Sequence, residues 1–179
     1  AMAITPPSER IWWKEPVHRV EIIWIIIAFL WGVAMFFTMI WWHGFGQQNM
    51  SNEAYRIQPF QFAEKVDAMV ATHTVRQEGA FPVVKPPPGS DVYMMGRVYM
   101  WWPMLELEKG QTYRLHLSSI DLQHGFSLQP LNINIQVHPG YESVMTITPT
   151  SSGEFGIVCN EYCGLGHHAM QSTFTVTAR

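Results

Sequence analysis

An unbroken run of uncharged, mostly apolar residues near the N-terminus, residues 22–42, constrains this chain more than any other feature. At about 1.5 Å of rise per residue, a helix over this run is about 31 Å long, which matches the ~30 Å hydrocarbon core of a bilayer. Trp24 lies near one end of the run, and Trp41 and Trp42 lie at the other, as expected at membrane interfaces. The run is too long for a signal peptide and lacks a cleavage pattern, so we expect a transmembrane helix.

The basic residues on either side of this span predict its orientation. Arg10, Lys14 and Arg19 precede the span, whereas the first basic residue after it is Arg56. Lys and Arg are enriched on the cytoplasmic side of membrane proteins. We therefore expect residues 1–21 to form a cytoplasmic segment and the larger part of the chain to lie outside.

The composition excludes several classes of protein. Only 14% of the residues are charged, against about 25% in a typical soluble domain, whereas 47% are hydrophobic. Disordered chains combine low hydrophobicity with high charge, so this chain is expected to fold. The net charge is −3, and Lys and Arg form no cluster, so we do not expect nucleic-acid binding.

The sequence outside the span divides at about residue 90. Residues 43–90 show few strand patterns, although a short helix is expected around residues 63–71. The prolines at residues 86–88 then interrupt regular structure. We expect residues 43–90 to form a connector that lies against a partner or against the domain that follows.

Residues 91–179 show the pattern of half-buried β-strands, in which apolar and polar side chains alternate. The apolar members of three such segments are Tyr113, Leu115 and Leu117, then Leu131, Ile133, Ile135 and Val137, then Phe174 and Val176. Turn signals such as Pro139-Gly140 separate the segments. Several short strands in a region of this length are typical of a β-sandwich or a small Greek-key barrel.

Sulfur and imidazole groups are concentrated in residues 159–170, a loop between two predicted strands. The loop contains Cys159, Cys163, His167 and Met170, together with two glycines that allow tight turning. Thiolate and thioether sulfur combined with imidazole are ligands that suit copper.

Several kinds of site fit part of this loop. A disulfide between the two cysteines suits an oxidising compartment, but it leaves the histidine and methionine without a role. A tetrahedral zinc site would use both cysteines, His167 and another histidine, but not the methionine. A single blue-copper centre uses one cysteine, two histidines and a weak methionine, so one cysteine is left over. Two thiolates can instead bridge two copper ions, each with one imidazole and one weak ligand.

The second imidazole of such a site must come from outside the loop, and His124 in the segment DLQHGF is the best candidate. It lies at a predicted strand junction, in a position that a Greek key can bring beside the loop. We expect the other histidines to lie on the surface or in packed positions, with the last at the rim of the site. They are His18, His43, His73, His116, His138 and His168.

These segments together resemble a known family. The pattern C-x-E-x-C-G-x-x-H-x-x-M, from Cys159 to Met170, resembles the dinuclear copper (CuA) signature of cytochrome c oxidase subunit II, and DLQHGF also resembles that family. The segments LNINIQVHPG and VDAMVATHTVRQEG are most similar to the B-type heme–copper oxidases, a branch that a single span also suits.

The resemblance implies a mainly β fold, a cupredoxin-like Greek-key β-sandwich outside the membrane with one N-terminal transmembrane helix. It also implies a dinuclear copper centre. The implied ligands are His124, Cys159, the backbone carbonyl of Glu161, Cys163, His167 and Met170. The two thiolates would bridge the coppers, each histidine would bind one copper, and the thioether and the carbonyl would be the weak ligands.

The resemblance extends to three further features. In many family members the side chain equivalent to Glu161 also binds magnesium shared with the large subunit, whereas B-type members can carry Gln there. Residues 99–103 resemble the stretch where soluble cytochrome c docks, so Trp101 or Trp102 would receive the electron; hydrophobic packing is the other interpretation. Glu21 resembles a glutamate that can begin a proton path; an interfacial charge is the other interpretation.

The function implied by the resemblance is that of an electron-input subunit of a respiratory heme–copper oxidase in the plasma membrane of a prokaryote. Such a subunit accepts electrons from cytochrome c and passes them to hemes in the catalytic subunit, which reduces oxygen to water coupled to proton translocation. This chain alone would then catalyse no reaction. The alternatives are the CuA subunit of a nitric oxide reductase and a membrane-anchored copper or zinc carrier, whereas the anchor argues against a nitrous oxide reductase domain.

Overall fold

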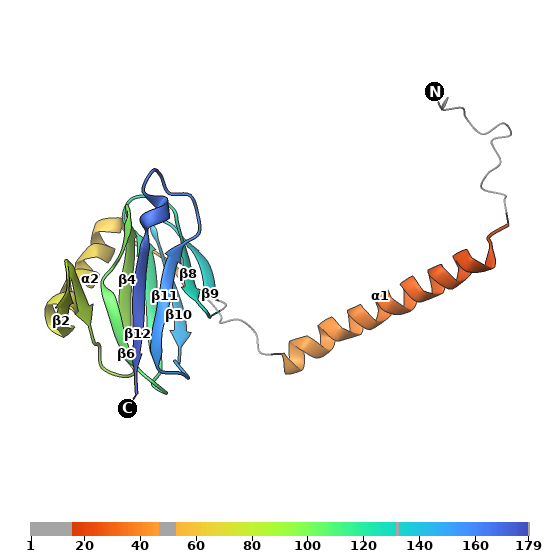
Figure 1. Ribbon diagram of the computed structural model, residues 1–179, viewed down its shortest axis with the longest axis horizontal. Helices are drawn as coiled ribbons and strands as arrows, with labels where there is room; N and C mark the ends of the chain where they lie inside the picture. The colour runs from red at the N-terminus through yellow and green to blue at the C-terminus, as the bar shows by residue number, and fades with distance from the viewer. Residues whose placement is uncertain (1–15, 47–52, 132, 179) are drawn as a thin grey trace, which may run out of the picture. The chain divides into compact units, whose positions relative to one another are not determined.

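The apolar run near the N-terminus forms one continuous helix, α1 (Arg19–Phe45), drawn in red to orange in Figure 1. Its apolar side chains are exposed around the whole helix. The carboxylate of Glu21 accepts a 3.0 Å hydrogen bond from the backbone N–H of His18, which satisfies one of the free donors of the first turn. Among the described residues, α1 is the one helix that is long and apolar enough to cross a membrane.

The computed structural model describes residues 16–46, 53–131 and 133–178. The chain divides into two units, Ala1–Asn49 with α1 and Met50–Arg179 with the described strands. Most of the expected cytoplasmic segment, with Arg10 and Lys14, lies outside the described residues.

Two sheets form the second unit (Figure 1). The first sheet contains, in spatial order, β1 (Glu53–Arg56), β10 (Tyr141–Ile147), β7 (Tyr113–Ser119), β4 (Asp91–Arg97) and β5 (Met100–Trp102). The second sheet contains β2 (Thr74–Glu78), β3 (Phe81–Val84), β6 (Met104–Glu108), β12 (Gln171–Thr177), β11 (Gly153–Cys159), β8 (His124–Gln129) and β9 (Ile133–Val137). The described helical elements of this unit are α2 (Pro59–His73) and a 3-10 turn, η2 (His167–Ala169).

The alternating sequence pattern produces the core of this β-sandwich. Strand β4 runs parallel to β7, and β6 runs parallel to β3 and β12, whereas the other pairings between described strands are antiparallel. Tyr113, Leu115 and Leu117 on β7 are buried, as are Phe174 and Val176 on β12. The predicted mainly β sandwich is therefore confirmed. The second of the three predicted segments forms a shorter strand than its pattern suggested: β9 begins at Ile133, and the exposed Leu131 lies outside it.

The segment expected to be a connector contributes to both sheets. Its strand β1 pairs with β10, and β3 pairs with β6. Its helix α2 extends beyond the predicted residues 63–71 at both ends and begins with Pro59, which suits a first helical position. Phe62, Val66 and Met69 lie on one face of α2 at helical spacing and are buried. The β-sandwich therefore includes residues before position 90 as well as after it.

A cluster of polar side chains, centred on the buried His116, lies on the first sheet where α2 packs. The Nδ1 atom of His116 is 2.5 Å from a carboxylate oxygen of the buried Glu142, and its Nε2 atom is 3.1 Å from the carboxylate of Asp91. Lys65 on α2 reaches the same Glu142 at 3.1 Å. His116 is thus a packed histidine, as expected from the sequence, and its contacts link the helix to the sheet.

A second cluster, of charged side chains, connects β2 and the residue that follows β3 to β6. Glu106 is buried, and its carboxylate pairs with Arg76 and lies 3.5 Å from the Lys85 ammonium. The hydrogen bond from Arg76 outweighs desolvation by burial and holds the pKa of Glu106 below its ordinary value. The ionised carboxylate therefore stabilises the folded state, and this stability is lost as the pH falls through the lowered pKa.

Replacing this carboxylate by an amide is expected to weaken the fold at neutral pH. Glu106→Gln should lower the free energy of unfolding at pH 7 by about 2 kcal/mol, because the guanidinium loses a charged partner. Above about pH 4.5 the difference from wild type should be constant, and it should shrink at lower pH as the wild-type carboxylate becomes protonated. Urea unfolding at several pH values measures it. Glu78→Gln, which alters an exposed partner of Arg76, is the control and should cost about 0.5 kcal/mol or less.

Candidate metal centre

The loop predicted to bind metal connects β11 to β12 at one end of the β-sandwich, the blue loop with a short helical turn in Figure 1. A backbone hydrogen bond from Cys159 N–H to the Met170 carbonyl, 3.1 Å long, closes its base. Strand β8 lies beside β11, and the Asn160 N–H continues this pairing by donating to the Gly125 carbonyl at 3.1 Å. His124, the first residue of β8, is therefore held beside the loop, although it lies far away in the sequence.

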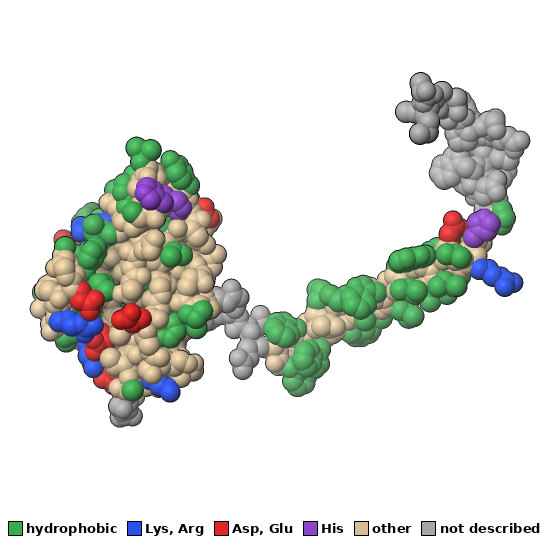
Figure 2. Space-filling model, viewed as in Figure 1, with side chains coloured by type: hydrophobic (Ala, Val, Ile, Leu, Met, Phe, Trp, Pro, Cys, Tyr) green, Lys and Arg blue, Asp and Glu red, His purple; other side chains and the backbone are tan. Residues whose placement is uncertain are grey.

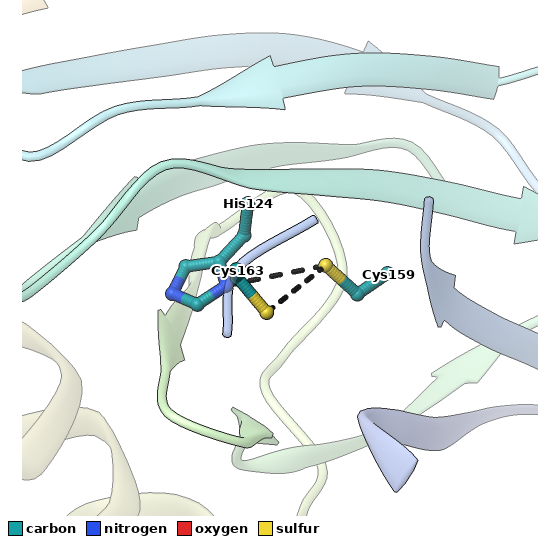
Figure 3. Close-up of side chains that lie close together, drawn as sticks. All are labelled: His124, Cys159 and Cys163. Atoms are coloured by element: carbon teal, nitrogen blue, oxygen red, sulfur yellow. Dashed lines mark hydrogen bonds between the residues drawn. The ribbon is translucent and has the colours of Figure 1, made fainter. Parts of the chain in front are cut away.

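The close-up in Figure 3 shows that the side chains of His124, Cys159 and Cys163 converge. The two Sγ atoms are 3.8 Å apart, and Cys159 Sγ is 4.0 Å from Nδ1 of His124. All three residues are buried. A disulfide bond requires about 2.05 Å between sulfurs, so the cysteines are free thiols in this structure.

The other predicted ligands surround the same two sulfur atoms. Cys163 Sγ lies 3.7 Å from Nδ1 of His167 and 3.8 Å from the Met170 sulfur, which is buried. On the other side, Cys159 Sγ lies 3.2 Å from the backbone carbonyl oxygen of Glu161. The structure thus gathers all six residues that the sequence singled out.

Burial affects the protonation of the Cys163 thiol in the absence of metal. Desolvation, together with the neighbouring Cys159, raises the pKa of the Cys163 thiol to about 11. Metal binding to such a thiol must displace its proton. Soft sulfur donors combined with imidazoles in a dry pocket suit copper, and the buried thioether has no use in a zinc site. The donor set therefore fits copper.

Asp121, to which the sequence patterns gave no role, contacts one of the candidate ligands. Its carboxylate lies 2.8 Å from Nε2 of His124, so the Nδ1 atom of that ring faces the thiols. The carboxylate also accepts backbone hydrogen bonds from Val98 at 2.7 Å and Leu122 at 2.5 Å. Burial opposes its ionisation, but these hydrogen bonds prevail and hold the pKa of Asp121 below its ordinary value. The signal was an aspartate three residues before a candidate ligand, a pattern that orients metal-binding imidazoles.

Gly125 also has a role that composition did not reveal. A β-carbon at this position would lie 2.0 Å from the side-chain oxygen of Asn160 and 2.8 Å from the backbone nitrogen of Glu161. Only a residue without a side chain lets the start of the loop pass this close to β8. The glycine therefore allows His124 and Cys159 to lie side by side.

The two candidate tryptophans occupy different environments. Trp101 is fully buried, with its ring centroid 6.0 Å from that of His124 and 5.3 Å from that of Phe126. Trp102 is half-buried, and the guanidinium of Arg97 lies 5.2 Å from its ring. Trp101 is thus part of the core next to a candidate ligand, and Trp102 is the one that reaches the surface.

The surface around the loop is apolar and almost free of charge. Figure 2 shows histidine and hydrophobic side chains gathered at one end of the β-sandwich. Tyr162 is 76% exposed and Leu165 is 89% exposed, and His168 is also exposed. The sequence contains no charged residue between Glu161 and Arg179. Exposed apolar side chains grouped in this way form a candidate contact surface.

Comparisons with known proteins point to one family. No family model matches the chain. Cytochrome c oxidase subunit 2 of Thermus thermophilus is 38% identical over 110 residues, which cover 58% of this chain and 82% of that protein. A second subunit of the same name, also from Thermus thermophilus, shows the same identity over 66% of its length. A chain in a cryo-EM structure of a heme-copper terminal oxidase dimer superposes with a TM-score of 0.57 at 20% identity, over 89% of this chain and 100% of that chain. This superposition shows a common fold.

Proposed function

This chain belongs to the cytochrome c oxidase subunit 2 family, and we propose that it is the electron-input subunit of a respiratory heme–copper oxidase. It receives electrons from a cytochrome c and passes them to the hemes of a catalytic membrane subunit, subunit I. That subunit reduces oxygen to water and couples the reaction to proton translocation, so this chain catalyses no reaction alone. The observation that carries the proposal is the pair of free, buried thiols, 3.8 Å apart and flanked by two imidazoles.

The six clustered residues would hold two copper ions. The thiolates of Cys159 and Cys163 would bridge the metals, and His124 and His167 would each bind one of them. Met170 would be a weak ligand of one copper, and the Glu161 carbonyl a weak ligand of the other. When bound, the paired coppers share one unpaired electron, which spreads the structural change on reduction over two metals. The proximity of every donor to one of the two sulfurs supports this assignment.

The role of the polypeptide is to hold these donors still. Backbone hydrogen bonds close the loop at its base and tie it to β8, as described above. Within the loop, His167 N–H donates to the Gly164 carbonyl at 3.1 Å, and Ala169 N–H donates to the Gly166 carbonyl at 3.0 Å. A loop fixed in this way changes its structure little when an electron arrives. The reorganisation energy is therefore low, and fast electron transfer requires a low reorganisation energy.

The apolar end of the β-sandwich is the surface on which we expect partners to dock. A soluble cytochrome c would approach the uncharged loop surface, and its electron would pass by way of Trp101 or Trp102. The burial of Trp101 beside His124 and the partial exposure of Trp102 support a role for the pair. Shape and apolar contact, rather than opposite charges, would then determine the affinity of the donor.

Three further assignments belong to the same proposal. The side chain of Glu161, which accepts a 2.9 Å hydrogen bond from Gln136, could bind magnesium together with the catalytic subunit. Glu21, whose carboxylate caps the first turn of α1, would lie at the cytoplasmic start of a proton path. The protein would be a single-pass protein of a prokaryotic plasma membrane, with α1 as anchor and the β-sandwich in the periplasm or outside the cell.

Metal content and spectroscopy of the purified full chain test the proposal. After loading with copper, we expect two coppers per chain and an EPR signal from one electron shared by two copper nuclei. Binding of one zinc ion, or of one exchangeable copper ion, would overturn the proposal and indicate a metal carrier. The heme types and the gas consumed by the complex that co-purifies distinguish oxygen reduction from nitric oxide reduction.

A further inference from the structure

The aromatic ring of Tyr99 fills a space that two glycines of the metal-binding loop leave open. A β-carbon at Gly166 would lie 2.3 Å from Cδ2 of this ring, and one at Gly164 would lie 2.6 Å from its hydroxyl oxygen. Side-chain atoms do not approach each other this closely, so position 166 requires glycine as long as the ring is present, and position 164 as long as the hydroxyl is present. We call these two glycines, Gly164 and Gly166, the glycine seat, and the side chain of Tyr99 contacts both of them.

The glycine seat lies directly under the turn that presents one of the ligands. The carbonyls of Gly164 and Gly166 accept the hydrogen bonds from His167 and Ala169 that form η2. Tyr99 therefore packs against Gly164, whose carbonyl accepts the His167 N–H, and against Gly166, the residue next to His167.

The segment that carries the ring is also connected to the second histidine. Val98, adjacent to Tyr99, donates its backbone N–H to Asp121 at 2.7 Å, and Asp121 contacts Nε2 of His124 at 2.8 Å. One short path of contacts thus connects His167 to His124: glycine seat, Tyr99, Val98 and Asp121. None of the residues on this path is a candidate copper ligand, and all of them lie within the β-sandwich unit.

We propose that Tyr99 is a positioning residue for the copper centre, which fixes the two histidines relative to each other through the glycine seat and Asp121. The inference rests on the proposed function, because it assigns a role toward the same metal site. The ring acts by its shape at Gly166, so the main contact does not need the hydroxyl group, which lies against Gly164. Residues that support metal ligands typically change metal affinity about 10- to 100-fold when they are removed.

Four variants of the copper-loaded full chain in detergent test the proposal. Tyr99→Ala should lose copper to a chelator at least about 10-fold faster than wild type, and its absorption and EPR spectra should be altered. Tyr99→Phe should behave as wild type, because it keeps the ring. Gly166→Ala should resemble Tyr99→Ala, whereas adding Gly166→Ala to Tyr99→Ala should have little further effect, because the clash with the ring is gone.

Two controls separate positioning from general loss of stability. Tyr141→Ala removes an exposed tyrosine ring from β10, and Gly156→Ala adds a methyl group on β11 where no atom lies within 4 Å. Neither should change copper loss or the spectra. Thermal unfolding of the metal-free variants shows whether each one is folded.

The outcomes distinguish this inference from the proposed function. If wild type holds two coppers and Tyr99→Ala keeps both its spectrum and its rate of copper loss, the positioning role is overturned and the copper site stands. If Tyr99→Phe is as defective as Tyr99→Ala, shape does not explain the effect and the inference is also overturned. If wild type itself binds no copper pair, the proposed function fails.

Discussion

Replacing Cys163 with serine is expected to remove the copper centre while the β-sandwich remains folded. The sulfur of Cys163 lies within 3.8 Å of three other candidate donors: the Cys159 sulfur, the His167 ring nitrogen and the Met170 sulfur. A serine hydroxyl is a harder donor with a higher pKa and does not replace a bridging thiolate. Copper affinity should fall by at least about a hundredfold, more than for a residue that only supports a ligand.

Copper analysis and EPR of Cys163→Ser measure this effect, with oxidation of the donor by the whole complex as a second readout. We expect fewer than two coppers per chain, no shared-electron signal and loss of electron input. Met170→Leu is the matched control, because it conserves volume at a buried position and removes only the weak donor. It should keep both coppers and change the spectrum. Two coppers with a native spectrum in Cys163→Ser would contradict a bridging role for this thiol.

The clustering of the candidate ligands could be predicted because most of them are local. Cys159, Cys163, His167 and Met170 lie within one loop, so their spacing is visible in the sequence. His124 was recognised by its segment and by the topology expected of the strands, and the pairing of β8 with β11 brings it to the loop. The residues that support the ligands were not predictable in this way.

Support for the ligands depends on contacts between segments that sequence patterns do not connect. Tyr99 contacts the metal-binding loop from a distant part of the sequence, and Asp121 accepts a hydrogen bond from Val98, which is adjacent to Tyr99; an aspartate or tyrosine in a turn has many other possible roles. Gly125 is read from sequence as a flexible residue, whereas the structure uses it for close approach. Such roles follow from packing in three dimensions.

Within the fold, too, the sequence pattern predicted some strands and not others. Strand β12 has one buried and one more exposed face, and β7 alternates apolar and polar residues although nearly all of them are buried, so alternation revealed both strands. Strands β1 and β2 lie at the edges of their sheets and are exposed along their whole length, so their sequences carry no alternation. This is why residues before position 90 resembled a connector.

We expect the two adjacent tryptophans to have different roles, with Trp101 stabilising the fold and Trp102 acting at the surface. Trp101 is fully buried, so Trp101→Ala leaves a large cavity and should lower the free energy of unfolding by about 3–5 kcal/mol. Trp102→Ala removes a half-buried ring and its contact with Arg97, and should cost about 1 kcal/mol. Urea unfolding of the two variants measures the difference.

The conservative variant sharpens this test, because the indole N–H of Trp101 has no hydrogen-bond partner among the described residues. Trp101→Phe fills most of the space without burying that unpaired donor, so it should cost less than Trp101→Ala by about 2 kcal/mol. If Trp102 receives the electron, Trp102→Phe should slow reduction of the copper centre by cytochrome c while unfolding stays near wild type. If Trp101→Phe slows reduction instead, at nearly native stability, the buried ring beside His124 is the electron acceptor. Unchanged reduction in both variants would contradict the assignment of either tryptophan.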